Sequence, residues 1–201
     1  MPIQYTAEER DAIRARIREA ALQSFQEKGL KKTTLADLTG PAGIAKSTFY
    51  QFWDSKEELY LELLIELGDR VRRRTVAEGL HRGAGTKDAL RRYLYGAVAV
   101  IDAEPLYKRV ISRPDDLAQL LKKMTPEQVS EASDSGINDV LDFVAREQAA
   151  GRIAGDDPGT VLGVLRGVLL LPVHEPEFGD GYRSVLEATI EAVTTGLTTE
   201  H

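Results

Sequence analysis

The stretch TTLADLTGPAGIAKSTFYQFWDSKEEL, residues 33–59, decides the fold of this chain. It predicts two short helices on either side of a glycine turn. Thr34 can cap the first helix, Gly43 allows the left-handed conformation of the turn, and Ile44 fills the space between the helices. The second helix is expected over residues 46–52. This pattern predicts a helix-turn-helix, whose second helix enters the major groove of DNA.

The second predicted helix carries polar side chains that suit phosphates and base edges. These are Lys46, Ser47, Thr48, Tyr50 and Gln51. Lysine pairs with guanine and glutamine with adenine, so Lys46 and Gln51 are candidates for reading bases. Phe49 and Trp53 lie four residues apart, and we expect them to pack inward. A helix pair with no role in DNA binding would carry the same apolar residues, so the pattern alone leaves both interpretations open.

The segment closely resembles the DNA-binding domain of the TetR family of bacterial transcriptional regulators. The matching residues are Thr33-Thr34, Asp37-Leu38, Ala42-Gly43-Ile44, Thr48-Phe49-Tyr50 and Lys56-Glu57-Glu58-Leu59. The resemblance implies that Thr34, Lys46, Thr48, Tyr50 and Lys56 touch DNA, chiefly its phosphates. Thr34 would act from a helix N-terminus, which favours a phosphate. Tyr50 would donate its phenol, and Lys56 would act as a point charge.

Two positions depart from the family pattern. Phe52 stands where the family often has a tyrosine or histidine that donates to phosphate, and phenylalanine cannot donate. Gly40 and Pro41 replace better helix formers before the turn, and proline disfavours helical geometry at the residue before it. We therefore expect one phosphate contact to be missing and the first motif helix to be short or distorted.

Helix signals dominate the remainder of the chain. Capping boxes predict helix starts at Thr6, Ser55 and Thr125. Besides the motif helices, the expected helices cover residues 6–29, 87–103, 105–112, 115–124, 125–151 and 182–197, together with a long helix from Lys56 and another from Pro158. The fold class is all-α, with about nine to ten helices. A three-helix helix-turn-helix domain, residues 1–55, is joined by the long helix to a helical bundle, residues 56–201.

Two helices near the C-terminus are candidates for a dimer interface. Gly163 and Gly167 permit close approach of another helix, and the last helix carries an apolar stripe. The stripe consists of Leu186, Ile190, Val193 and Leu197. Taken alone, such a stripe favours packing inside the chain's own core. The resemblance implies instead that these helices pair with a second copy in a four-helix bundle.

The helical bundle is also the expected site of a small-molecule effector. Candidate ligand-binding residues are Tyr93, Tyr107, Met124, Phe143 and His174. Each of them would equally serve as an ordinary core residue, and a mostly apolar ligand is the default. The resemblance implies that ligand binding shifts the long helix and changes the separation of the two recognition helices of a dimer.

Composition excludes several other classes of protein. The chain has no cysteine, which excludes disulfides, iron–sulfur clusters and thiolate zinc sites. No apolar run is long enough to span a membrane, and no secretion signal is recognisable, so we expect a cytoplasmic protein. The net charge of −6 argues against wholesale coating of nucleic acid. Residues 1–56, however, carry nine Lys and Arg against seven Asp and Glu.

We expect no catalytic residue, metal or cofactor. His174 lies beside two glutamates, but prolines on either side prevent a helical ligand pair, and a single histidine is a poor basis for a zinc site. Four arginines near the end of the long helix have two interpretations. Arg70, Arg72, Arg73 and Arg74 either complement the helix C-terminus or bind a phosphate-bearing ligand.

The sequence therefore predicts a TetR-like transcriptional repressor. It would bind a palindromic operator in double-stranded DNA as a homodimer and be released by a small molecule. One alternative is a helix-turn-helix regulator with no small-molecule ligand, controlled by a protein partner. A less favoured alternative is a small helical enzyme that uses His174 and nearby carboxylates.

Overall fold

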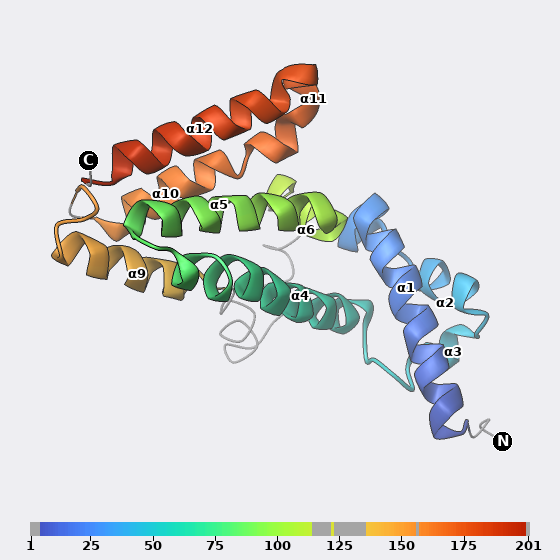
Figure 1. Ribbon diagram of the computed structural model, residues 1–201. Coiled ribbons are helices and arrows are strands. Elements are labelled where there is room, and N and C mark those ends of the chain that lie inside the picture. The colour runs from blue at the N-terminus through green and yellow to red at the C-terminus, as the bar shows by residue number, and fades with distance from the viewer. Residues whose placement is uncertain (1–4, 114–121, 123–135, 156, 200–201) are drawn as a thin grey trace.

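The computed structural model describes residues 5–113, 122, 136–155 and 157–199. Within this part of the chain every regular element is helical, and extended segments pair only at one antiparallel bridge, between Ile153 and Thr198. The all-α prediction is confirmed. Figure 1 shows α1, α2 and α3 at one end of the molecule, with α4 running from them into a bundle that contains α5, α9, α10 and α12.

The helices have the following bounds. The α-helices are α1 (Ala7–Lys32), α2 (Leu35–Ala42), α3 (Lys46–Phe49), α4 (Lys56–Arg72), α5 (Thr86–Ala103), α6 (Pro105–Ser112), α9 (Ile137–Ala149), α10 (Pro158–Val168), α11 (Glu175–Phe178) and α12 (Tyr182–Leu197). A π-helix, Arg73–Ala77, continues directly from α4, and 3-10 turns cover Leu80–Arg82, Leu171–His174 and Gly179–Gly181. Across the described residues, none of these helices combines the length and apolar character that a membrane crossing needs.

The helix starts follow the predicted caps only in part. Thr6 and Glu9 form a complete capping box at α1. At α4 the Ser55 hydroxyl accepts from the Glu58 N–H at 3.1 Å, but the Glu58 carboxylate accepts from the N–H of Asp54, one residue earlier than a capping box requires. The prediction of a full box at Ser55 is therefore wrong in its second half. Both arrangements still satisfy N–H groups that the first helical turn leaves without partners.

Glycines mark where two predicted helices end or begin. Gly29 has φ 76, which breaks the helical conformation of α1 near its end, as expected. Gly136 has φ 81, and α9 begins at the next residue. The prediction of one helix over residues 125–151 is therefore wrong, because a residue in the left-handed region interrupts it. The predicted cap at Thr125 and the predicted helix over residues 115–124 lie outside the described residues.

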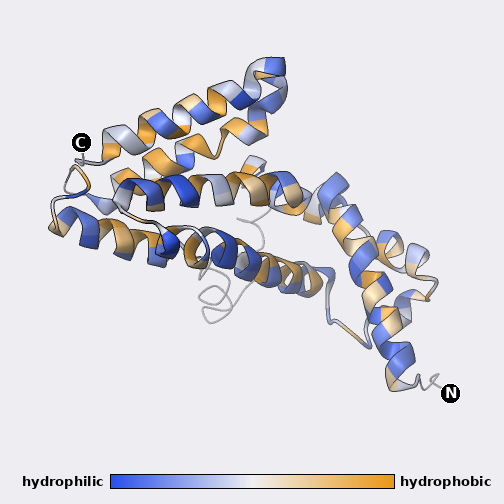
Figure 2. Ribbon diagram, in the orientation of Figure 1, coloured by the Kyte–Doolittle hydropathy of each residue, from blue (hydrophilic) through white to orange (hydrophobic). Residues whose placement is uncertain are grey.

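Two packed cores hold the described helices together. In the first, Phe25, Leu38, Phe49 and Trp53 are buried together, which confirms that Phe49 and Trp53 pack inward. This core continues along the buried side of α4 and includes Leu106 of α6. The second core is formed mainly by α5, α9, α10 and α12. Figure 2 shows the corresponding pattern, with hydrophobic residues along one side of these helices and hydrophilic residues on the other.

The apolar stripe of α12 belongs mostly to the chain's own core. Leu186 and Ile190 are buried there, and Val193 and Leu197 pack against it half-buried. The assignment of Leu186 and Ile190 to a dimer interface is therefore corrected, because these two pack within one chain, whereas for Val193 and Leu197 it stays a prediction. Gly163 and Gly167 of α10 lie on the exposed side instead, and a Cβ atom at either position would meet nothing within 4 Å.

Candidate nucleic-acid interface

A helix-turn-helix is assembled from α2, the turn at Gly43 and α3. Thr34 and Asp37 form a capping box at the start of α2. The helix ends in a Schellman motif, in which the N–H of Gly43 donates to Gly40 and the N–H of Ile44 donates to Thr39. Gly43 has φ 68, the left-handed conformation that the sequence predicted.

The helices of the motif differ from expectation in length. α2 extends through Gly40 and Pro41 to Ala42, so the expected shortening is not observed. α3 ends at Phe49 rather than at Phe52, because the N–H groups of Gln51 and Phe52 donate three residues back, as in a tight turn.

Four of the predicted DNA-contacting residues lie exposed on α3 and the turn that follows it. They are Lys46, Ser47, Tyr50 and Gln51. Tyr50 is 55% exposed, although its ring meets the buried ring of Phe49 edge-on at 5.7 Å. Thr34, at the start of α2, is also exposed. Thr48 differs from these, because it is only 8% exposed and belongs to the buried polar residues.

Lys56 has a structural role that the sequence did not reveal. Its ammonium group donates to the carbonyl oxygens of Leu30 at 2.8 Å and Thr33 at 2.6 Å. These carbonyls lie at the end of α1, where the helix leaves such groups without partners of their own. Lys56 therefore ties the start of α4 to the end of α1, and two of its three N–H donors are already engaged.

Arg10 is a residue of this surface that sequence reasoning missed. Its guanidinium donates to the backbone carbonyl of Gln51 at 3.2 Å and lies over the Phe52 ring, 5.0 Å from its centre. Phe52 is half-buried in this contact. A positive charge thus lies beside the position where the family pattern offers a phenol or imidazole donor. The signal in the sequence was the spacing of Arg10, Arg14 and Arg18, which places all three on one side of α1.

The other two arginines of that row fasten α1 to α4. Arg14 pairs with Glu62 at 2.8 Å, and Arg18 pairs with both Glu62 and Glu66. The indole N–H of Trp53 also donates to Glu62, at 2.8 Å. Three donors from α1 and the end of the motif therefore converge on one carboxylate of α4, so a movement of α4 would carry the motif with it.

Asp37 is a negatively charged residue on the surface that also carries the candidate DNA-contacting side chains. A hydrogen bond from Lys28, at 2.6 Å, is the main reason why the pKa of Asp37 lies far below its usual range, with further contributions from the backbone and hydroxyl of Thr34. The carboxylate therefore stays ionised at any ordinary pH. The paired ammonium of Lys28 offsets its repulsion toward a phosphate.

The geometry defines a helix-turn-helix DNA-binding module. Residues 17–63 match the family model described as bacterial regulatory proteins, tetR family. The uncharacterised HTH-type transcriptional regulator YdgC of Bacillus subtilis (strain 168) is 30% identical over 87 residues, which are 43% of this chain and 45% of that protein. The HTH-type transcriptional regulator TtgR of Pseudomonas putida is 38% identical over 65 residues, 32% of this chain and 31% of that protein.

The chain spans less than half the length of these curated relatives. Similarity in fold extends further. The ketosteroid transcriptional regulator KstR2 of Mycobacterium tuberculosis superposes with a TM-score of 0.70 at 23% identity, over 98% of each chain. The DNA-binding module of the chain, residues 17–63, is thus similar to that of the TetR family, and the fold resembles that of solved TetR-family regulators. The matched proteins are transcriptional regulators rather than enzymes.

The structure does not gather the predicted ligand-binding residues into one cavity. Tyr93 and Tyr107 lie close to each other in the second core, where burial raises the pKa of Tyr93 to about 12. His174 is exposed, with Nδ1 2.9 Å from the carboxylate of Glu177. Its assignment to an interior ligand site is therefore corrected. Met124 lies outside the described residues, and Phe143 lines a separate pocket.

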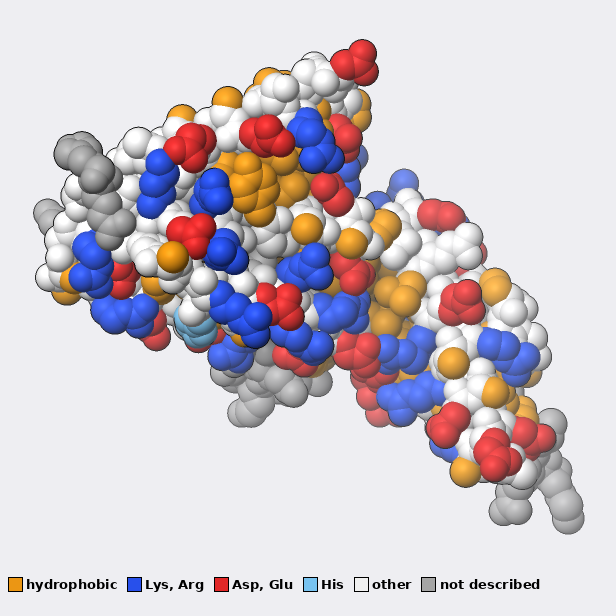
Figure 3. Space-filling view, in the orientation of Figure 1, with side chains coloured by type: hydrophobic (Ala, Val, Ile, Leu, Met, Phe, Trp, Pro, Cys, Tyr) orange, Lys and Arg blue, Asp and Glu red, His pale blue; other side chains and the backbone are white. Residues whose placement is uncertain are grey.

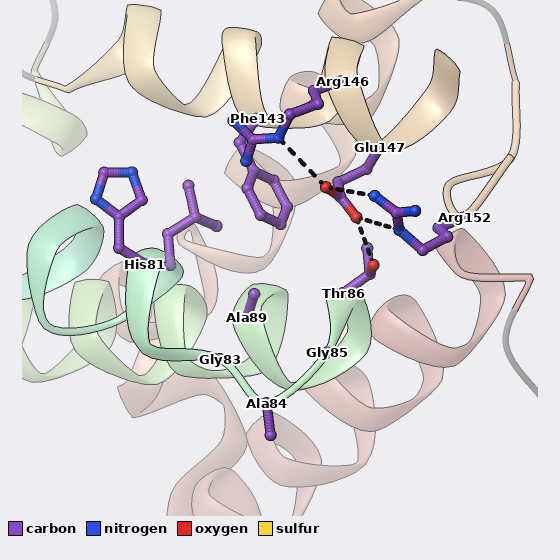
Figure 4. A pocket seen from close by; sticks show the side chains of 11 residues that line it. His81, Gly83, Ala84, Gly85, Thr86, Ala89, Phe143, Arg146, Glu147 and Arg152 are labelled. Carbon is purple, nitrogen blue, oxygen red and sulfur yellow. Dashed lines mark hydrogen bonds and ion pairs between the residues drawn. The ribbon is translucent and has the colours of Figure 1, made fainter. Parts of the chain in front are cut away.

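That pocket, of about 520 Å³, lies where the loop before α5 meets α9. Figure 4 shows Glu147 linked to Thr86 and Arg152 on one side of the pocket, with Phe143 and His81 toward the other side. The Glu147 carboxylate accepts from Arg152 at 2.7 and 3.0 Å and from the Thr86 hydroxyl at 2.6 Å. These bonds join α9 to the start of α5.

The Glu147 cluster predicts a pH dependence of stability. The hydrogen bond from Arg152, followed by that from Thr86, lowers the pKa of Glu147 from 4.5 to about 2. A carboxyl with a lowered folded-state pKa stabilises the fold fully above pH 4.5 and loses that contribution as the pH falls toward 2. Between pH 6 and pH 2.5 the free energy of unfolding should fall in both proteins. We expect the fall to be about 2–3 kcal/mol smaller in Glu147→Gln than in the wild type, as measured by urea unfolding. Equal losses in both proteins would contradict this assignment.

Proposed function

We propose that the protein is a cytoplasmic transcriptional repressor that binds a palindromic operator in double-stranded DNA as a homodimer and is released by a small-molecule effector. The observation that carries the proposal is the exposed row of Lys46, Ser47, Tyr50 and Gln51, presented by a helix-turn-helix that is fastened to α4. These side chains offer donors to phosphates and to base edges. A dimer would present two such rows to half-sites about 34–36 Å apart.

The row predicts two distinguishable kinds of contact. We expect Tyr50→Phe, which removes one phenol donor, to weaken binding to all duplexes alike. We expect Gln51→Ala to cost about 1–3 kcal/mol at one base pair of each half-site and little elsewhere. Fluorescence anisotropy with a preferred duplex and its single-base variants measures both effects. A base-specific loss from Tyr50→Phe, or a uniform loss from Gln51→Ala, would reverse the two assignments.

The exposed side of α10 and α12 supports the homodimer. Val164 and Leu170 are exposed, as is Val185 of α12. Gly163 and Gly167 lie on the exposed part of α10 and would let another helix approach closely. Figure 1 shows these two helices at the edge of the bundle, on the opposite side from α9 and α4. We therefore place the proposed interface here rather than on the buried stripe of α12.

This placement predicts the effect of one charge. We expect Val164→Asp to convert the dimer to a monomer at micromolar concentration, because it would bury an unpaired carboxylate in the interface. The control is Ala145→Asp, which introduces the same charge on an exposed position of α9. Sedimentation velocity distinguishes the two states. A dimeric Val164→Asp variant with unchanged affinity would show that the dimer uses another surface.

The proposed release by an effector is supported by the attachments of α4 at both ends. In its N-terminal half, Glu62 accepts hydrogen bonds from Arg14 and Arg18 of α1 and from the indole of Trp53, which follows the helix-turn-helix. At its C-terminus, Arg70 pairs with Glu104 at 2.9 Å, and this glutamate precedes α6. A rearrangement of the bundle that moves α4 would thus reorient the motif, which is the two-state behaviour that such release requires.

A further inference from the structure

Of the four arginines at and just after the end of α4, two are paired with carboxylates of the described residues and two are not. Arg70 donates to Glu104 at 2.9 and 3.2 Å, and Arg72 donates to Asp139 at 2.8 Å. Arg73 and Arg74 are exposed, and within the described part of the chain their guanidinium groups make no hydrogen bond or ion pair. An anion within reach of both positive charges would be attracted by each of them.

These two arginines line a pocket of about 300 Å³. The other side of the pocket is α5, which contributes the small side chains of Ala99 and Ala103 together with Val100. Glu104 lies in the lining but is already held by Arg70, whereas Glu78 adds one further carboxylate. Figure 3 shows Lys and Arg side chains gathered where α4 and α5 run side by side, with acidic side chains among them.

The backbone at this point departs from a regular helix. Arg73 and Arg74 begin a π-helix, in which the N–H of Glu78 donates to the carbonyl of Arg73 at 3.0 Å. Such turns are rare and occur frequently at functional sites. Gly96 of α5 lies so close that a Cβ atom there would be 3.0 Å from the carbonyl oxygen of Arg74. The close contact packs the backbone of Arg74 against α5, the helix that carries the alanines of the pocket.

We infer that this pocket binds a small organic anion, with its phosphate or carboxylate group between Arg73 and Arg74 and its apolar body against Ala99, Val100 and Ala103. Guanidinium groups bind both kinds of oxyanion through paired hydrogen bonds. The volume lies at the lower end of the range of about 300–1,000 Å³ for ligand sites, which favours a compact molecule. The lining of this site contains neither Tyr93 nor Tyr107 and shares no residue with the Glu147 pocket.

Isothermal titration of the whole protein, without DNA and at low ionic strength, tests the inference. The probes are phenyl phosphate and benzoate, with phenol as the neutral counterpart. We expect saturable binding of at least one anion and none of phenol. The stronger of the two anions identifies the head group. If neither anion binds at millimolar concentration, or if phenol binds equally well, the inference is wrong.

Matched variants separate a built site from general attraction. We expect R73Q/R74Q to weaken binding of the preferred anion at least tenfold. R91Q/R92Q removes the same number of charges from an exposed part of α5 and should change the affinity less than twofold. We expect A103L, which fills the hollow, to weaken phenyl phosphate binding at least fivefold while inorganic phosphate is unaffected.

Equal losses in the two double variants would show non-specific attraction and overturn the inference. Unchanged binding of phenyl phosphate and benzoate by A103L would overturn it as well. Thermal unfolding monitored by circular dichroism verifies that each variant is folded. Because all these measurements omit DNA, failure of this site would leave the proposed repressor function standing, and failure of operator binding would leave the site standing.

Discussion

Lys56→Met is expected to lower the free energy of unfolding by about 2 kcal/mol, because it removes a charged donor from two carbonyls. The methionine retains the apolar stem of the side chain but leaves the oxygens of Leu30 and Thr33 without the ammonium that now binds them at 2.8 and 2.6 Å. The end of α1 would then lose its hydrogen bonds to the start of α4. Urea unfolding followed by circular dichroism measures the loss.

Lys46→Met is the matched control for this variant. Lys46 is exposed and starts α3, so its replacement should change stability by less than about 0.5 kcal/mol. We expect it instead to weaken DNA binding and to reduce the dependence of log K on log salt by about one. A Lys56→Met variant as stable as the wild type would show that the two carbonyl bonds contribute nothing to stability.

Glu62→Ala is expected to loosen the attachment of the DNA-binding unit to α4. The variant leaves Arg14, Arg18 and the Trp53 indole without their shared acceptor. We expect it to lower the free energy of unfolding by about 2–3 kcal/mol. Trp53 is the one tryptophan of the chain, so its fluorescence reports on this contact directly. We expect a red-shifted emission maximum in the folded variant, as water replaces the carboxylate beside the indole.

The control for this prediction is Glu66→Ala, one turn further along the same helix. Among the described residues Glu66 forms an ion pair with Arg18 alone, and it is more exposed than Glu62, so its loss should cost less than about 1 kcal/mol. It should also leave the tryptophan emission unchanged. Equal destabilisation by both substitutions would contradict the central role that we assign to Glu62.

The helix-turn-helix was predictable because its signals are local. Thr34 caps the following turn of helix, and Gly43 is required where the backbone enters the left-handed region. The bonds of Lys56 were not predictable, because their acceptors lie 23 and 26 residues earlier in the chain. The sequence shows that a lysine is present at the start of a helix. It does not show whether a carbonyl or a phosphate accepts the hydrogen bonds of its ammonium group.

The apolar stripe of α12 illustrates a second limit. A period of three to four residues shows that one side of a helix is buried, but it does not show which partner buries it. Leu186 and Ile190 pack against the chain's own helices, while Val164 and Val185 remain exposed. Periodicity also failed at Gly136, where a single residue with φ 81 starts a new helix inside a stretch with helical spacing.

The most direct test of the account is selection of bound sequences from a random duplex library with the purified protein at near-physiological salt. Salt must be controlled because it sets how much non-specific binding survives. The account predicts enrichment of an inverted repeat whose half-sites are centred about one helical turn apart. Recovery of no preferred sequence, or of a single site without a repeat, would contradict operator recognition by a homodimer.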